Sequence, residues 1–318
     1  MQELHTNALG QLYNPVRQAG SVSTVHWHVL GAGAIGCLFA SALRHSGCPT
    51  TLLLRAGEDQ DAATIKVERE DQTTQVQLAA SPASAPGHIG HLLVTTKAQD
   101  VRDAVLSVAH RLDASSQVLL LVNGLGFDHT LRTELPAPAY FHGSTTEGAY
   151  RLERWHIRHA GRGVTRIGQP GLDSAPDWFG QWRRAVKPSH WDPLIAETLW
   201  LKLAINCAIN PLSALHRCSN GELAGPQLAP QVAALCDEVI DVSTAAGFAK
   251  VTTNLHQQVA DVISATAGNR SSMLQDVLAG RPTEIDYING HLIEVARQYG
   301  ISTPHNEALY DRIIKLGN

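Results

Sequence analysis

The chain has 318 residues, of which 44% are hydrophobic and 17% are charged, a balance typical of a globular protein. This length is enough for two domains that each bury a core of their own. The net charge of −4 gives no reason to expect a nucleic acid or an anionic membrane as a partner.

The cysteines and the apolar runs indicate the compartment. Five cysteines are scattered without any C-x-x-C pair, which is typical of reduced thiols rather than of a disulfide framework. Residues 1–20 lack the apolar run of a signal peptide, and no stretch approaches the roughly 20 apolar residues of a transmembrane helix. We therefore expect a cytoplasmic protein.

The first confident unit is a strand, a helix and a second strand. Residues 1–24 are polar, and we interpret them as a loose extension. A strand is predicted over 25–30 and a helix over 34–46, with Gly47 as the C-terminal stop of the helix. A strand over 50–54 then completes one βαβ unit.

Strands and helical stretches continue to alternate after this unit. Single strands are predicted over 92–95, 117–122 and 140–142, an antiparallel pair over 64–68 and 74–78, and a further hairpin over 155–159 and 164–167. The alternation predicts an α/β fold with a mostly parallel sheet covered by helices on both faces.

The pattern changes beyond Trp191, where only helices are predicted. These helices span 194–209, 231–246, 259–265 and 284–299. Pro188 and Pro193 interrupt the chain between the part that alternates strands with helices and the part in which only helices are predicted. We therefore divide the chain into a sheet domain over 25–191 and an all-helical domain over 192–318.

A glycine-rich turn joins the first strand to the first helix. In the sequence GAGAIG, Gly31 permits the tight turn, Gly33 lets the backbone approach a pyrophosphate, and Gly36 allows close packing of helix and strand. The helix N-terminus then presents free N–H groups to the phosphates. A strand before the turn and a helix after it favour a Rossmann-type, doubly wound nucleotide-binding domain over a merely glycine-rich turn.

The end of the second strand indicates which dinucleotide is bound. NAD enzymes usually carry Asp or Glu there, whereas this chain has Arg55, which can pair with a 2′-phosphate. We therefore expect NADP(H). Lys97 and Asn123 follow later strands and point to the same crevice, although each taken alone is better explained as an ordinary solvated or turn residue.

A polar stripe marks the first predicted helix of the second domain. Lys202, Asn206 and Asn210 are spaced i, i+4, i+8, so they drift by only about 40° per step and share one face. Their neighbours are largely apolar, and a polar stripe in such surroundings is either paired in the core or lines a cavity. Both interpretations stay open at this point.

A second cluster lies in the stretch 269–293. Gly280 and Pro282 should end one helix, and Thr283 with Asp286 resembles a capping box for the next, which places Glu284 in its first turn. On this pattern alone Glu284 is a routine favourable charge at a helix N-terminus. Ser271 and Ser272 are equally well explained as serines on a helix surface.

Other familiar chemistries are missing from the pattern. The sequence has no H-E-x-x-H, G-x-S-x-G or Walker motif. His26 and His28 alternate on a strand expected at the centre of the sheet, without a third ligand. We expect no metal site.

From about Val25 onward the chain resembles the ketopantoate reductase family. The resemblance rests on GAGAIG, LLVTTKAQDV, LLVNGLG, KLAINCAINPLSAL, CSNGEL and SSMLQDVLAGRPTEIDYINGHL, of which the last three are the most specific. It implies a Rossmann domain followed by a helical domain, with the active site between them. Two features depart from the family: the extension over 1–24 is long, and Glu147 stands where many relatives have His.

The resemblance also implies a role for individual positions. Lys202 matches the proton-donating lysine, and Glu284 matches the glutamate near that lysine and the cofactor. The implied substrate-binding positions are Asn123, Asn206, Asn210, Asn220, Asn269 and Ser272. The implied cofactor positions are Gly31, Ala32, Gly33, Ala34, Ile35, Gly36, Arg55, Lys97, Asn123, Ala149 (through its backbone) and Glu284.

The implied activity is NADPH-dependent reduction of ketopantoate to pantoate, in the biosynthesis of pantothenate and coenzyme A, by a monomer or homodimer. Three alternatives remain. These are a reductase of another 2-keto acid, a non-catalytic NADP(H)-binding sensor, and a hydroxyacyl-type dehydrogenase. The last should carry a catalytic His and an acidic residue in place of Arg55, and the chain shows neither convincingly.

Overall fold

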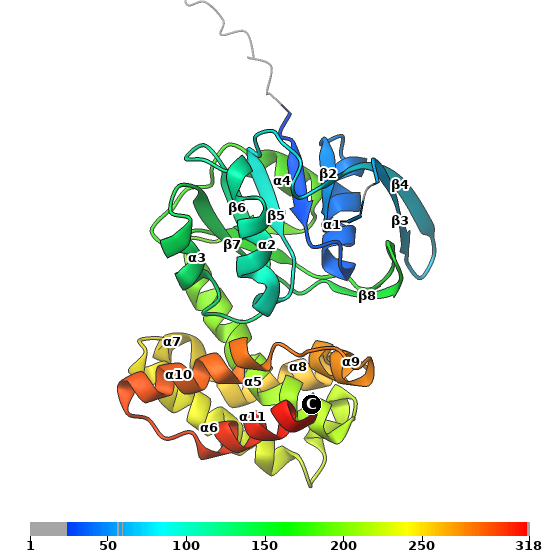
Figure 1. The fold of residues 1–318 in the computed structure, drawn as a ribbon. Helices are drawn as coiled ribbons and strands as arrows, with labels where there is room; N and C mark the ends of the chain where they lie inside the picture. Colours follow the sequence, from blue (N-terminus) through cyan, green and yellow to red (C-terminus); the bar gives the residue numbers. More distant parts are fainter. Residues whose placement is uncertain (1–23, 56, 59, 317–318) are drawn as a thin grey trace, which may run out of the picture.

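The computed structural model describes residues 24–55, 57–58 and 60–316. The extension expected over 1–24 therefore lies, apart from Thr24, outside the described residues. An eleven-stranded sheet with its helices forms one part of the molecule and a group of helices forms the other. The long helix α5 (Ile195–His216) connects them (Figure 1).

Six neighbouring strands form a parallel core, as the sequence predicts. They are β7 (Ala139–Thr145), β6 (Gln117–Leu120), β5 (His91–Val94), β1 (Trp27–Leu30), β2 (Thr50–Leu54) and β4 (Thr73–Pro82), in this spatial order. The chain moves outward from β1 through β2 to β4, and then returns to β5 on the other side of β1. The order of strands therefore reverses between β1 and β5, where ligands of open α/β sheets bind.

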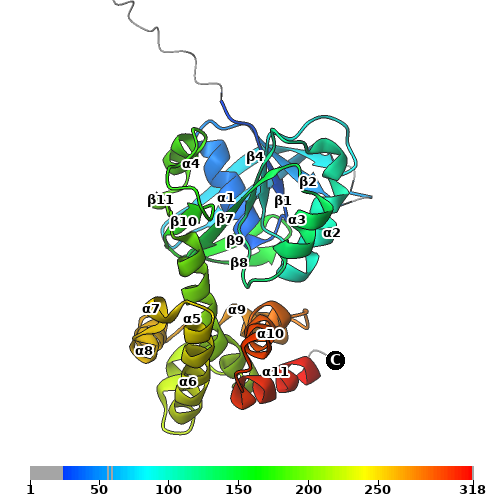
Figure 2. The same cartoon turned by 90° about the vertical axis from the view of Figure 1, so that its left-hand side faces the viewer.

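Helices cover both faces of this sheet because side chains alternate along its strands. Val29 packs in the core beneath α1 (Ala34–His45) and α4 (Phe179–Ala185), whereas Leu30 packs in the core beneath α2 (Val101–Ser107) and α3 (Asp128–Glu134). Figure 2 shows the two pairs of helices on opposite sides of the sheet. The fold class predicted from the sequence is thus confirmed.

The outer strands correct one prediction. β3 (Ala62–Glu68) pairs antiparallel with β4, as expected. The hairpin predicted over 155–159 and 164–167 is wrong. The first of its strands, β9 (His156–Gly161), pairs with β3 and with β8 (Gly148–Glu153), while β10 (Thr165–Gly168) pairs with β7 and with β11 (Ser189–Trp191). β8 escaped detection because most of its side chains are exposed and show no alternation.

The second part of the chain is helical, as expected beyond Trp191. After α5 come η3 (Asn220–Ala224), α6 (Ala229–Ala245), α7 (Ala249–Thr252), α8 (Leu255–Ala265), α9 (Ser272–Leu278), η4 (Ile285–Tyr287), α10 (Asn289–Tyr299) and α11 (Pro304–Leu316). The division at residues 191 and 192 remains our working domain boundary. Among helices in the described ranges, none is both long and apolar enough to cross a membrane.

Helix α5 continues through a proline that directly follows its polar stripe. Pro211 has no N–H to donate to the carbonyl of Cys207. The buried amide of Asn289 supplies the missing donor, because its Nδ2 lies 3.2 Å from that carbonyl oxygen. The prediction ended this helix at residue 209 because the effect of a distant amide on a proline could not be anticipated.

Candidate active site

The glycine turn after β1 is closely packed on one side. Gly31 has φ +105°, and a Cβ there would lie 2.6 Å from the backbone N of Thr96. A Cβ on Gly36 would overlap the carbonyl oxygen of Gly31 and lie 2.5 Å from Thr95 Oγ1. Both glycines are therefore required by the approach of α1 to the ends of β1 and β5.

The other side of the turn is open. A Cβ on Gly33 would meet no atom within 4 Å, and the N-terminus of α1 receives no hydrogen bond from a capping side chain. Thr96 Oγ1 is a buried hydroxyl beside this turn that lacks a hydrogen-bond partner among the described residues. Open space, uncapped N–H groups and an orphaned hydroxyl together fit the diphosphate of a dinucleotide.

Three more predicted residues follow the carboxyl ends of neighbouring strands. Arg55 follows β2 and is exposed, Lys97 closely follows β5, and Asn123 closely follows β6. Because these strands are parallel and adjacent in the order β6-β5-β1-β2, their ends lie along one edge of the sheet. The sheet thus brings all three residues to the edge that carries the glycine turn.

Lys97 connects this edge to the helical part of the molecule. Its Nζ forms a 2.6 Å ion pair with Asp276 Oδ2 of α9 and donates a 2.6 Å hydrogen bond to the carbonyl of Pro282. Asp276 is largely buried, and its other oxygen lies 3.0 Å from Arg281 Nε. The ammonium of Lys97 therefore holds the segment 276–282 against the sheet.

Glu284 makes a second connection to the same edge. Its Oε1 accepts a 3.1 Å hydrogen bond from the backbone N of Ala98, and its Oε2 accepts a 3.4 Å bond from Asn123 Nδ2. Burial raises the pKa of this carboxyl, while the bond from Ala98 opposes the rise. The carboxylate belongs to the junction of the two parts of the protein.

This arrangement corrects the prediction of a capping box. Glu284 itself precedes the short helix η4, which has no capping hydrogen bond from a side chain, and the long helix α10 begins only at Asn289. Glu284 is buried, so it is not a solvated charge at a helix N-terminus. The prediction failed because the partners of Glu284 are far away in the sequence.

Lys202 extends from the first half of α5 toward the sheet. Its Nζ donates a 3.0 Å hydrogen bond to the carbonyl oxygen of Thr145, the last residue of β7. Burial lowers the pKa of this ammonium to about 8, and the negative charge of Glu284 partly offsets the effect. An amine with such a pKa can both donate and regain a proton near neutral pH.

The two asparagines of the stripe are not paired in the core. Asn206 is half-buried and Asn210 is buried, yet neither side-chain amide has a hydrogen-bond partner in the described part of the chain. Neither amide is among the fully buried polar atoms of the described residues that lack a partner, so solvent or a ligand can reach both. Of the two interpretations of the stripe, these amides therefore fit the one in which it lines a cavity.

The remaining predicted substrate residues lie next to α5. The backbone N of Asn220 donates a 2.9 Å bond to the carbonyl of Asn269, and Asn220 Oδ1 is buried without a partner among the described residues. Ser271 is buried and caps α9 by accepting from the backbone N of Leu274 at 3.0 Å, so it is not a surface serine. Ser272, the first residue of α9, is exposed.

The turn from β7 into β8 carries the last predicted cofactor position. Ala149 is half-buried in β8 and packs against the core beneath α1. Two residues earlier, Glu147 Oε2 lies 2.6 Å from His159 Nε2 of β9, and both side chains are only 9% exposed. This turn therefore contains a buried acid–imidazole pair directly after the carbonyl that receives Lys202.

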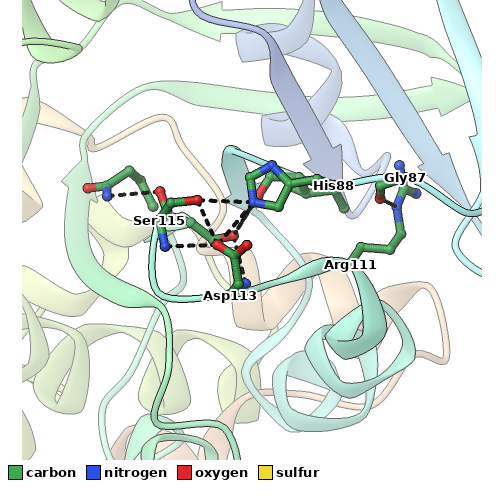
Figure 3. Close-up of polar contacts among 8 residues, drawn as sticks. Gly87, His88, Arg111, Asp113 and Ser115 are labelled. Atoms are coloured by element: carbon green, nitrogen blue, oxygen red, sulfur yellow. Dashed lines mark hydrogen bonds and ion pairs between the residues drawn. The ribbon is translucent and has the colours of Figure 1, made fainter.

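A Ser–His–Asp grouping also occurs elsewhere, at the amino ends of β5 and β6 (Figure 3). His88 Nε2 lies 3.1 Å from Asp113 Oδ1 and 3.2 Å from Ser115 Oγ. A hydrolytic triad needs the acid on one ring nitrogen and the serine on the other, whereas both contacts here use Nε2. The grouping ties two loops together at the edge opposite the glycine turn.

Sequence reasoning missed two residues of the site, Thr145 and Asp276. Thr145 contributes a backbone carbonyl, which leaves no mark in a sequence. Asp276 could have been noticed, because it is a charged residue among Met273, Leu274 and Val277, which pack against the helical core. Its partner Lys97 could not have been inferred from this pattern.

Comparison with known proteins gives one family over most of the chain. Residues 27–171 match the family model described as "Ketopantoate reductase PanE/ApbA", and residues 194–316 match "Ketopantoate reductase PanE/ApbA C terminal". A 2-dehydropantoate 2-reductase of Shigella flexneri is 38% identical over 288 residues, which cover 90% of this chain and 93% of the relative. One of Vibrio cholerae is 36% identical over 287 residues, covering 90% and 95%.

Solved structures agree with this result. A PanE/ApbA family ketopantoate reductase from Ralstonia eutropha JMP134 aligns with a TM-score of 0.82 at 26% identity, covering 92% of this chain and 98% of the other. D-mandelate dehydrogenase in a ternary structure with NADH and anilino(oxo)acetate aligns with a TM-score of 0.84, also over 92% and 98%, but at only 20% identity. The second likeness concerns the fold alone.

Proposed function

The chain belongs to the ketopantoate reductase family, and from that premise we propose that it reduces 2-dehydropantoate (ketopantoate) to pantoate with NADPH. The curated relatives carry this activity in their names, and the chain is an oxidoreductase with a Rossmann fold. The finer claims concern the cofactor, the proton donor and the residues around the substrate.

The position of Lys202 carries the proposal. Its amine lies between the sheet edge and the helical part, hydrogen-bonded to Thr145 O at 3.0 Å and in the field of Glu284. Reduction of a ketone leaves negative charge on the carbonyl oxygen, which must receive a proton. The Lys202 ammonium supplies that proton and is reprotonated from solvent, a contribution of about 10²–10⁴-fold to the rate.

The residues of the glycine turn fit a dinucleotide. Gly31, Gly33 and Gly36 shape an open approach to the N–H groups of α1, and Arg55 offers its guanidinium to a 2′-phosphate at the end of β2. The reduced cofactor, when bound, supplies the hydride that the ketone carbon receives. Lys97, Asn123, Ala149 and Glu284 complete the proposed cofactor region.

The substrate is held by the polar residues of the helical part. Asn206 and Asn210 offer unpaired amides on the same face of α5 as Lys202, and Asn220, Asn269 and Ser272 lie on the segments beside it. Hydrogen bonds from these groups to the carboxylate and hydroxyl of ketopantoate would fix the ketone against the nicotinamide side of the crevice. Lys202 and Asn206 are only half-buried, so solvent reaches the amine that must regain a proton.

The experiment follows the oxidation of NADPH at about 340 nm with ketopantoate and with a series of other 2-keto acids. The series includes phenylglyoxylate, the 2-keto acid that corresponds to mandelate. Each measurement is repeated with NADH in place of NADPH. The proposal expects ketopantoate with NADPH to give the highest kcat/KM. Preference for another keto acid would replace the substrate assignment with a divergent reductase. Binding of NADPH without turnover of any keto acid would favour a sensor.

The family name also suggests the setting of the reaction. We expect the protein to act in the cytoplasm, in the synthesis of pantothenate and coenzyme A, as a monomer or homodimer. Sedimentation of the purified protein with and without NADPH measures the oligomeric state directly.

A further inference from the structure

The carbonyl that receives Lys202 lies at the start of an unusually constrained turn. Thr145 ends β7 and Gly148 begins β8, so the turn has only two residues between the strands. Thr145 Oγ1 shares a 3.0 Å hydrogen bond with Thr165 Oγ1 and accepts a 3.2 Å bond from the backbone N of Glu147. These contacts restrict the orientation of the Thr145 peptide on one side of the turn.

The segment before β10 closes over the same turn. Thr146 N donates to the carbonyl of Val164 at 3.1 Å, and Val164 N donates to Thr146 Oγ1 at 2.9 Å. A Cβ on Gly163 would overlap the backbone of Thr146 and Glu147, so only glycine allows this approach. The segment that leads into β10 therefore constrains the turn by these two hydrogen bonds and by the close approach of Gly163.

On the side of β9, Gly148 pairs with the backbone of Gly161, and one contact between side chains of the described residues is added to this pairing. Glu147 Oε2 lies 2.6 Å from His159 Nε2, with both side chains 9% exposed. The register of β8 and β9 shifts between Gly148 and Ala149, directly beside this pair. Bulges of this kind are common next to active sites, where they re-aim the chain.

A contribution to stability does not explain well why Glu147 and His159 occur together at this position. Burying an acid with an imidazole costs desolvation that a pair of apolar side chains would not incur. The pair occurs at the turn whose first carbonyl accepts the bond from Lys202, and two residues before Ala149 of the proposed cofactor region. Its position links it to the proton donor rather than to the core.

We propose that Glu147 and His159 form a positioning pair, which fixes the β7–β8 turn so that the Thr145 carbonyl holds the Lys202 amine in place for proton donation. The pair touches neither the substrate nor the reacting atoms, and it acts through the peptide of Thr145. The inference rests on the proposed function of Lys202 and adds to it the device that orients this residue.

The chain offers a matched control in the same sheet. Glu68 Oε1 of β3 lies 2.7 Å from His156 Nε2, the first residue of β9, with side chains 24% and 18% exposed. This second acid–imidazole pair has the same chemistry and lies on the same strand β9. No contact of Glu68 reaches the turn 145–148 among the described residues.

The test compares Glu147→Ala, Glu147→Gln and Glu68→Ala in the reductase assay. Because the ammonium would lose a fixed acceptor, Glu147→Ala should lower kcat by about tenfold to a hundredfold with KM values changed less than roughly threefold. Glu147→Gln keeps an oxygen for His159 and should retain most of kcat. Glu68→Ala should leave kcat unchanged.

The pH profile separates positioning from a general loss of stability. Losing the bond to Thr145 disfavours the charged amine, so Glu147→Ala should move the alkaline limb of kcat/KM to lower pH. Glu284 is the charged neighbour that shifts the Lys202 pKa, and it is retained in every variant. A kcat and an alkaline limb like those of the wild type in Glu147→Ala, or an equal loss in Glu68→Ala, would overturn the proposal.

Two further measurements keep the outcome decisive. If Glu147→Ala does not fold, the apolar double variant Glu147→Val with His159→Val removes both polar side chains together and should fold, with the same loss of kcat. If the wild type turns over no keto acid, the proposed function fails. The titration of Lys202, followed by ¹³C NMR of labelled lysine with Lys202→Ala to assign the signal, still tests the pair. An Lys202 pKa unchanged by Glu147→Ala would then reject it.

Discussion

Two alanine substitutions in the glycine turn should separate folding from cofactor binding. In Gly36→Ala the new methyl would overlap the Gly31 carbonyl oxygen and lie 2.5 Å from Thr95 Oγ1. In Gly33→Ala it would meet no protein atom within 4 Å. The first methyl points into the protein, whereas the second points into the space that we assign to the diphosphate.

The expected magnitudes follow from these contacts. Overpacking against backbone costs about 3 kcal/mol, and the better helix propensity of alanine returns about 1 kcal/mol at most, so Gly36→Ala should lose about 2–3 kcal/mol. At about 2–4 °C per kcal/mol this lowers Tm by about 4–12 °C. Gly33 has an extended backbone with φ −77°, which alanine also adopts, so Gly33→Ala should change stability by less than about 1 kcal/mol.

The assays are thermal unfolding without cofactor and a fluorescence titration with NADPH. Gly33→Ala should unfold like the wild type and bind NADPH at least about tenfold more weakly, which corresponds to about 1.4 kcal/mol. If Gly33→Ala binds NADPH normally, the diphosphate does not lie over this turn. If Gly36→Ala unfolds at the temperature of the wild type, the steric reasoning about the approach of α1 is wrong.

Three other predictions concern charges. Arg55→Ala should raise the Kd for NADPH by about 10–100-fold, the worth of a charge-assisted hydrogen bond, and leave the Kd for NADH unchanged; equal losses for both cofactors would contradict the assignment. Asp276→Asn removes the buried partner of Lys97 and should cost about 1–3 kcal/mol in urea unfolding, and no change would show that this contact does not stabilise the protein. Burial lowers the pKa of His28 and His91 to about 4, so the unfolded chain binds more protons between about pH 6.5 and 4, and the free energy of unfolding should fall as the pH drops through this range. His28→Gln should flatten this dependence, and an unaltered slope would contradict it.

The parallel core and the glycine turn could be predicted because their signals are local. Apolar runs mark the strands, and Gly31, Gly33 and Gly36 mark the turn between strand and helix. Once the strands are known to be parallel, their carboxyl ends share one edge, which brings Arg55, Lys97 and Asn123 together. The sequence therefore contained enough information for the sheet and for the expected cofactor edge.

The contacts between the two parts of the molecule could not be predicted from local patterns. The local pattern alone placed Glu284 at a solvated helix end, whereas its carboxylate is buried against the backbone of Ala98; only the family resemblance indicated a role near Lys202. The partner of Lys202 is a backbone carbonyl, and because every residue has one, the sequence cannot indicate which carbonyl accepts the bond. The exposed strand β8 likewise lacks the alternation that would reveal it, and its pairing with β9 depends on the sheet edge offered by β3.

The central claim is that Lys202 donates the proton in NADPH-dependent reduction of ketopantoate. The most direct measurement is kcat for this reaction in the wild type and in Lys202→Ala, with the Kd for NADPH measured for both proteins. We predict that the wild type turns over ketopantoate and that Lys202→Ala loses about 10²–10⁴-fold in kcat while it binds NADPH normally. A near-normal kcat in Lys202→Ala, or no turnover of ketopantoate by a wild type that binds NADPH, would contradict the account.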